Sequence, residues 1–105
     1  MATIMELNDR FRRTLMGGRL VFTSGINSLP EETVAQVISR LVTFDAFDED
    51  NDPHGEHDFG QIEVDGTKVF FKIDYFDRAM RFHSPDPSDP EVTQRVLTVM
   101  LAEEY

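Results

Sequence analysis

The chain has 105 residues, a formal net charge of −10 and no cysteine. This length fits one domain, and a chain with 40% hydrophobic residues, nine of them Phe, can fill one core. The absence of cysteine excludes disulfides, thiolate metal sites and a thiol nucleophile, and no apolar run reaches the roughly 18 residues of a membrane helix. We therefore expect a soluble, cytoplasmic protein.

The first predicted element is a helix near the N-terminus. Its apolar residues recur at spacings of three and four, at Ile4, Leu7, Phe11 and Leu15, which is typical of one helix face. Asn8, Arg12 and Arg13 fall outside this stripe. The pair Gly17–Gly18 predicts the end of the helix, and residues 20–23 then predict a short strand.

A second helix has a clear predicted start. Ser28 is a candidate cap, Pro30 would lie in the first turn, and Glu31 would complete a capping box. One apolar stripe carries the helix to about Asp45, with members Val34, Val37, Ile38, Leu41 and Phe44.

The pair Asp65–Gly66, between two alternating runs, predicts a hairpin with a two-residue turn. This turn pairs Val64 with Thr67, and it places one set of side chains on the core face: Ile62, Val64, Val69, Phe71, Ile73 and Tyr75. The opposite face carries Phe70 and Phe76 beside Lys72 and Asp74. We expect these two aromatic residues either to be covered by a helix or to form a binding patch.

Residues 79–83 predict a third strand of this sheet, and the proline-rich stretch 84–90 predicts irregular structure. Asp89–Pro90 then predicts a final helix, whose apolar face would be Val92, Val96, Leu97, Val99, Met100 and Leu101. Residues 1–105 are thus predicted to form a single α+β domain in the order αβαβββα. Its antiparallel sheet would have three or four strands, with about three helices packed on it.

Three stretches together resemble one family of short bacterial proteins of unknown function. They are NDPHGEHDFG at 51–60, FFKIDYFD at 70–77 and SPDPSDPEVTQRVLTVMLAEEY at 84–105, and LNDRFRRT at 7–14 also fits. The genes of this family are often found on plasmids and other mobile elements, and no activity is established for it. The resemblance implies an accessory role on a mobile element and no particular reaction.

The segment 45–58 is the most acidic part of the chain, with seven Asp or Glu in fourteen positions. Its alternating aspartates are similar to the start of an EF-hand loop, but Pro53 stands where that loop needs glycine and Phe59 stands at its twelfth position. We expect a solvated loop that binds a basic partner, through Asp48, Glu49, Asp50, Asp52, Glu56 and Asp58.

A transition-metal site is the alternative for this segment. Imidazole and carboxylate groups suit zinc or manganese, and the candidate ligands are His54, Glu56, His57 and Asp58. The HExxH signature is absent, as are serine triads, phosphate-binding glycine loops and dinucleotide motifs. We therefore predict no catalytic residue, no metal and no cofactor, and in the structural interpretation His57 and Asp58 hydrogen-bond the loop backbone.

Charge also restricts the partners. Eleven of the twenty acidic residues lie between residues 20 and 66, where Arg40 is the single basic residue, and such a field repels nucleic acid and anionic membranes. We expect the arginines at 10, 12, 13 and 19 to neutralise this region, in the same molecule or in a second copy.

The leading hypothesis is a non-catalytic protein-binding module. It would act as a nucleic-acid mimic that blocks a basic, nucleic-acid-binding surface, as an anti-CRISPR or anti-restriction inhibitor would. Two other hypotheses stay open: a metal-dependent hydrolase or nuclease centred on residues 54–58, and a regulatory accessory domain that works as a homodimer.

Overall fold

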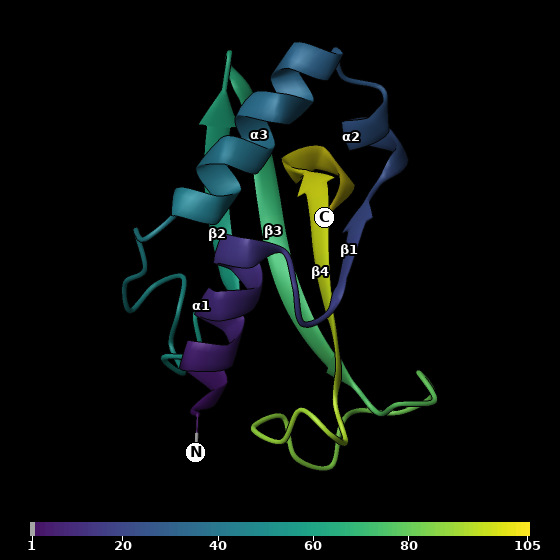
Figure 1. Ribbon diagram of the computed structural model, residues 1–105. Helices are drawn as coiled ribbons and strands as arrows, with labels where there is room; N and C mark the ends of the chain where they lie inside the picture. The colour runs from purple at the N-terminus through teal and green to yellow at the C-terminus, as the bar shows by residue number, and fades with distance from the viewer. Residues whose placement is uncertain (1) are drawn as a thin grey trace.

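In the computed structural model, which describes residues 2–105, three helices cover one face of a four-stranded sheet (Figure 1). In chain order the elements are α1 (Ile4–Thr14), β1 (Arg19–Phe22), α2 (Ser24–Asn27), α3 (Glu31–Thr43), β2 (Phe59–Val64), β3 (Thr67–Phe76), β4 (Gln94–Leu101) and the 3-10 turn η1 (Ala102–Glu104). This is a single α+β domain, as predicted.

The sheet is mixed, with the strand order β1-β4-β3-β2. β2, β3 and β4 are antiparallel neighbours, whereas β1 lies parallel to β4 at the other edge. The predicted hairpin and its register are confirmed, since Val64 pairs with Thr67. Asp65 and Gly66 have φ values of 51° and 79°, as a two-residue hairpin turn of this kind requires.

The predicted final helix is wrong, because residues 94–101 form the central strand β4. A central strand that is buried on both faces is apolar at most positions, so its side chains also fit a helical stripe. Five of the eight residues of β4 are buried. The pair Asp89–Pro90 belongs to a turn instead, in which the Asp89 carboxylate accepts the backbone N–H of Glu91 at 2.9 Å.

Two other local predictions are corrected. α3 begins at Glu31 after Pro30 without a side-chain cap, and Ser28 instead ends the short helix α2. Residues 79–83 form a turn with a single bridge between Phe76 and His83, not a third strand of the hairpin sheet. In both places a turn directly follows another element. The residue types of such a turn also occur at a helix cap or in a strand, so the sequence alone does not distinguish these structures.

The core lies between the sheet and the helices. The six hairpin residues predicted for the core are all buried, and they contact Phe11, Ile26, Val37 and Leu41 of the helices. Alternation along β3 turns Phe70 and Phe76 to the opposite face, which no helix covers in the part of the chain described (Figure 1). Within residues 2–105, no helix is both long enough and apolar enough to span a membrane.

α1 differs from its predicted pattern. Asn8 and Arg12 fall outside its apolar stripe, yet both side chains are completely buried. The two residues are four apart and so lie on one face of the helix. α1 therefore packs against the domain with a partly polar face.

Candidate functional site

The acidic segment has two parts: an outer half, residues 48–51, which lies at the surface, and an inner half, residues 52–58, which packs against the rest of the domain. In the inner half, the buried carboxylate of Asp52 accepts the backbone N–H groups of Glu56 and His57 at 2.9 and 3.1 Å. The Glu56 carboxylate accepts the phenol O–H of Tyr75 at 2.8 Å, and burial raises the pKa of Asp58. Asp52 and Glu56 of the predicted partner surface are therefore engaged within the fold, and Asp58 is half-buried.

His57 also lies within the inner half. Its ring stacks on Phe47, with the ring centroids 4.0 Å apart, and its Nδ1 hydrogen-bonds Asp9 Oδ1 at 2.9 Å. Burial opposes ionisation of Asp9, but hydrogen bonds from His57 and Arg12 outweigh it and lower the pKa of this carboxyl. His57 is thus held by a ring and a carboxylate, as a structural residue is.

The four residues proposed as metal ligands do not form a ligand set. His54 is exposed, while Glu56 and His57 are bonded to Tyr75 and Asp9 respectively. Nowhere in the described range 2–105 do three His, Asp or Glu side chains come together as a metal site would need.

A buried polar network connects the inner half to α1, β3 and β4. Asn8 is at its centre: its amide donates to the Tyr75 phenol oxygen at 2.7 Å and to the Glu56 carbonyl at 3.0 Å. Its own carbonyl accepts from Nε of Arg95 at 2.9 Å. Burial and the hydrogen bond to Glu56 raise the pKa of Tyr75, and burial lowers the pKa of Arg95.

One turn along α1, Arg12 holds the start of the acidic segment. Its guanidinium donates to Asp9 at 3.0 Å and to the Phe44 carbonyl at 2.8 Å, and it lies 5.1 Å from the centre of the Phe47 ring. The Arg12 Nε is buried without a hydrogen-bond partner in the described chain. Arg12 thus contacts the chain just before the acidic segment, but among residues 2–105 its ion pair is with Asp9 of α1 and not with an acidic residue of 20–66.

The outer half of the segment remains at the surface. Asp48, Glu49 and Asp50 are all exposed. The Asp48 carboxylate accepts the backbone N–H groups of Asp50 and Asn51 at 2.9 and 3.0 Å, and the Asn51 side chain in turn accepts the Asp48 N–H at 2.9 Å. These bonds give the outer half a defined turn and hold the Asp48 carboxylate in position.

The outer half borders three aromatic side chains on the helix-free face of the sheet. Phe59, Phe70 and Tyr105 contact one another with ring centroids 5.2 to 5.6 Å apart. Together with residues of the outer half, they enclose a hollow of about 440 Å³, which we call the acid–aromatic pocket. It is lined by Asp48, Asp50, Asn51, Phe59, Gln61, Phe70 and Tyr105.

Only one residue of the predicted aromatic patch takes part. Phe70 lines the acid–aromatic pocket, whereas Phe76 lines a separate hollow beside Asp58 and His83. Phe59 and Tyr105 did not stand out in the sequence, because one precedes the hairpin run and the other lies 35 positions after Phe70. The sheet brings the three rings together.

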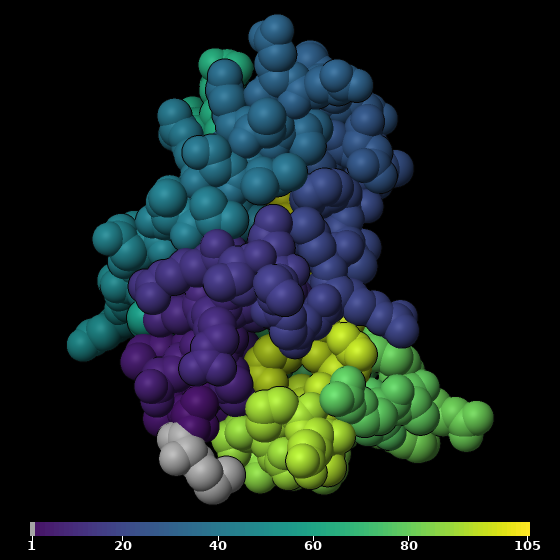
Figure 2. Space-filling model, in the orientation of Figure 1, coloured from purple at the N-terminus to yellow at the C-terminus, as the bar shows by residue number. Residues whose placement is uncertain are grey.

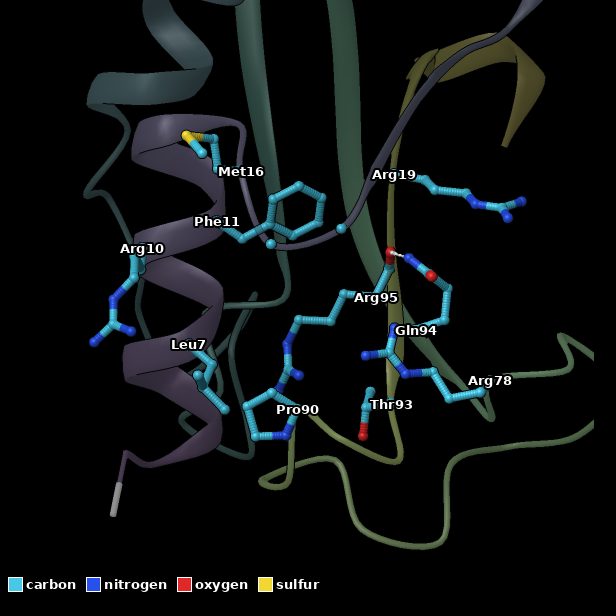
Figure 3. Close-up of a pocket in the computed structure, with 12 residues that line it drawn as sticks. Leu7, Arg10, Phe11, Met16, Arg19, Arg78, Pro90, Thr93, Gln94 and Arg95 are labelled. Carbon is cyan, nitrogen blue, oxygen red and sulfur yellow. Dashed lines mark hydrogen bonds between the residues drawn. The ribbon is translucent and has the colours of Figure 1, made fainter.

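A second hollow, of about 500 Å³, lies on the helix side of the domain, between α1 and the segment 84–93 (Figure 2). Four arginines line it and no acidic residue does: Arg10, Arg19, Arg78 and Arg95. We call it the arginine pocket (Figure 3). No pattern in the sequence indicated this pocket.

A family model described as "Protein of unknown function (DUF3768)" matches residues 22–104. The chain belongs to the DUF3768 family. This confirms the resemblance to a family of unknown function. No curated protein and no solved structure matched the chain significantly.

The DUF3768 match covers the two pockets to different extents. It includes every residue of the acid–aromatic pocket except Tyr105, whereas α1 and the segment that leads into β1 precede it. The arginine pocket therefore combines the DUF3768 region, which supplies Arg78 and Arg95, with the preceding segment, which supplies Arg10 and Arg19.

Proposed function

We propose that this protein is a non-catalytic binding module that captures a basic segment of a partner protein in the acid–aromatic pocket. One observation carries the proposal: three aromatic rings stand beside two exposed carboxylates, those of Asp48 and Asp50. Aromatic faces attract Arg and Lys cations, and the carboxylates complement the same charge. The pocket thus has both groups that a basic side chain would need.

The shape of the pocket fits a long basic side chain. The aliphatic stem of Arg or Lys packs on apolar surface while its charged end stays at the rim. Tyr105 is 73% exposed, so a bound side chain would cover an aromatic surface that is otherwise left to solvent. A net charge of −10 would also attract a basic partner over a distance and repel nucleic acid.

Our specific proposal for the partner is a nucleic-acid-binding protein. A basic surface that binds the phosphate backbone is complementary to this domain for the same electrostatic reason. Occupation of that surface would exclude nucleic acid, so the protein would act as an inhibitor of the anti-CRISPR or anti-restriction kind.

The direct test uses a short acetylated peptide with one arginine between glycines, titrated by calorimetry. We expect binding by the wild type and a loss of about threefold or more for Phe70→Leu, which keeps an apolar side chain but removes the aromatic face. Phe76→Leu is the matched control, because it changes the same residue type on the same strand outside the pocket.

A peptide in which citrulline replaces arginine gives the second control, since it keeps the shape and removes the charge. Equal affinity for both peptides, or equal effects of the two Phe substitutions, would contradict the proposal. The inhibitory role is tested separately by adding the protein to a captured basic partner bound to DNA, where release of the DNA is the expected result.

A further inference from the structure

The arginine pocket has a charge opposite to that of the chain. Acidic residues outnumber basic ones twenty to ten in the sequence, yet this pocket is lined by four arginines and by no Asp or Glu. A chance selection of surface residues would contain more acids than bases. The composition of the lining therefore indicates a site for a negatively charged group.

Arg95 gives the second, independent observation. Its side chain is only 3% exposed, and among residues 2–105 it forms no ion pair with a carboxylate. Its Nε donates to Asn8 and its Nη2 donates to the carbonyl of Pro87, whereas Nη1 has no hydrogen-bond partner in the described chain. A guanidinium stays charged in proteins. The Arg95 charge has only the Tyr75 ring, 5.2 Å away, and the more distant Glu56 carboxylate to compensate it, so an anion in the pocket would complete this compensation.

Figure 3 shows how the arginines are arranged. The Arg95 side chain extends from β4 toward α1, and the guanidinium of Arg78 lies beside Gln94 on the same strand. Arg78 donates through Nε to the Glu91 carbonyl at 3.2 Å, and its two terminal nitrogens have no partner in the range described. Arg10 and Arg19 extend away from the hollow on either side, and they add positive charge around it.

Apart from the polar residues Thr93 and Gln94 and two glycines, the rest of the lining is apolar. Phe11 and Leu7 of α1 and Pro90 form one wall, and Met16, which is 74% exposed, lies at the edge. A volume of about 500 Å³ falls within the range of small-molecule sites. An organic group attached to the anion would cover the exposed methionine.

We propose that the arginine pocket binds a small phosphomonoester that carries an apolar group, with Arg95 and Arg78 holding the phosphate and Leu7 and Met16 contacting the apolar part. Two guanidinium groups match the double charge of a phosphate monoester. A long polyanion does not fit, because the net charge of −10 would repel it, whereas repulsion of a small dianion is screened within about 8 Å at physiological ionic strength.

The test uses phenyl phosphate as the probe, followed by calorimetry and by the NMR signal of the Arg95 Nε–H. We expect phenyl phosphate to bind about tenfold or more tightly than inorganic phosphate, because its ring is buried, and to shift the Arg95 signal. Phenol lacks the phosphate and should not bind measurably.

Arg78→Gln should weaken phenyl phosphate binding about tenfold or more, since it removes one of the two charged donors. Arg81→Gln is the matched control: it makes the same charge change at an exposed residue outside the pocket, and we expect less than about a twofold effect. Arg78 is exposed, so its substitution should leave the domain folded, and circular dichroism of both variants verifies this.

Four results would each overturn the proposal. They are an equal loss in the two variants, an unchanged Arg95 signal, a tighter complex with benzoate than with phenyl phosphate, and a tighter complex with a short single-stranded oligonucleotide. The first would indicate a general charge effect. The last two would assign the pocket to a carboxylate or to nucleic acid.

Discussion

The two pockets differ in how the fold builds them. The acid–aromatic pocket takes its charges from one short exposed turn, at Asp48 and Asp50, whereas the arginine pocket takes its central charge from the buried Arg95. Phe70 and Arg95 also point to opposite faces of the sheet, because Arg95 is opposite Tyr75 on the helix-covered face. The exposed charges of Asp48 and Asp50 can thus be changed at little cost to stability, whereas the buried charge of Arg95 cannot.

α1 connects the two regions through its buried polar face. Arg12 holds the chain that leads to the acidic turn, and Asn8, one turn earlier, holds Arg95. Substitutions in the core, in the network and at the surface should therefore have separable effects on stability and on the binding of the two kinds of ligand.

The largest expected effect is on stability alone. Leu41→Ala removes a completely buried side chain of α3, and we expect the free energy of unfolding to fall by about 2–5 kcal/mol, as measured by urea denaturation. Leu41 lines neither pocket, so the affinities for the arginine peptide and phenyl phosphate should not change while the protein is folded. A change in either affinity would mean that the pockets depend on overall stability.

Asn8→Ala should affect stability and one pocket. It leaves the Arg95 Nε without its acceptor and the Tyr75 phenol without the Asn8 donor, and an unsatisfied buried polar group costs about 1–3 kcal/mol. We expect weaker binding of phenyl phosphate, because Arg95 loses its support, and unchanged binding of the arginine peptide. If phosphate binding is also unchanged, the network does not position Arg95.

Asp52→Asn should have a moderate effect on stability. The Asp52 carboxylate accepts two backbone N–H groups and is 3.7 Å from the His57 ring nitrogen, and hydrogen bonds to charged groups contribute about 1.5–3 kcal/mol. We expect a loss of about 1–2 kcal/mol, because the amide retains one acceptor oxygen. Asp50→Asn, two residues away at the surface, should be within about 0.5 kcal/mol of wild type. Equal effects would contradict the division into inner and outer halves.

The sequence predicts the parts of the fold that depend on neighbouring residues. The hairpin follows from Asp65–Gly66 and from strict alternation on each side, so both its register and its core face were predicted correctly. The strand β4 was predicted as a helix because its apolar residues fill both faces, and only its position between β1 and β3 explains this pattern. Periodicity cannot supply that position.

The same distinction applies to the candidate sites. Asp48, Asp50 and Phe70 were identified individually, since an acidic run and an aromatic residue on a polar face are visible in the sequence. Their combination with Phe59 and Tyr105 depends on the sheet. The arginine pocket had no local signal, because its lining comes from α1, the segment before β1, the turn after β3 and the start of β4.

Tyr75 predicts a pH dependence that links the two regions. Its pKa is raised above the ordinary value of 10.0 by burial and by its hydrogen bond to Glu56. The folded state therefore keeps the proton where the unfolded state loses it, so this contribution to stability is complete below pH 10 and declines as the pH rises above it. Between about pH 9 and pH 11, wild type should lose more stability than Tyr75→Phe, as measured by urea denaturation. Parallel curves would show that the phenol titrates equally in both states.

The smallest expected effect concerns the exposed charges and the association with a basic partner. Glu49 and Asp50 are exposed, and neither side chain forms a hydrogen bond or ion pair within residues 2–105. Changing them to Gln and Asn should leave stability within about 0.5 kcal/mol of wild type. Association with a basic peptide should nevertheless slow, because long-range attraction accelerates encounter. Salt screens this attraction beyond about 8 Å at physiological ionic strength, so added salt should slow wild type more than the double variant, as followed by stopped-flow measurement.

Asp65→Asn at the hairpin turn removes a charge outside the acid–aromatic pocket, and it should retain most of the wild-type rate and salt dependence. If the double variant associates as fast as wild type at low salt, the acidic turn does not attract the partner, and the aromatic rings of the pocket must account for binding alone.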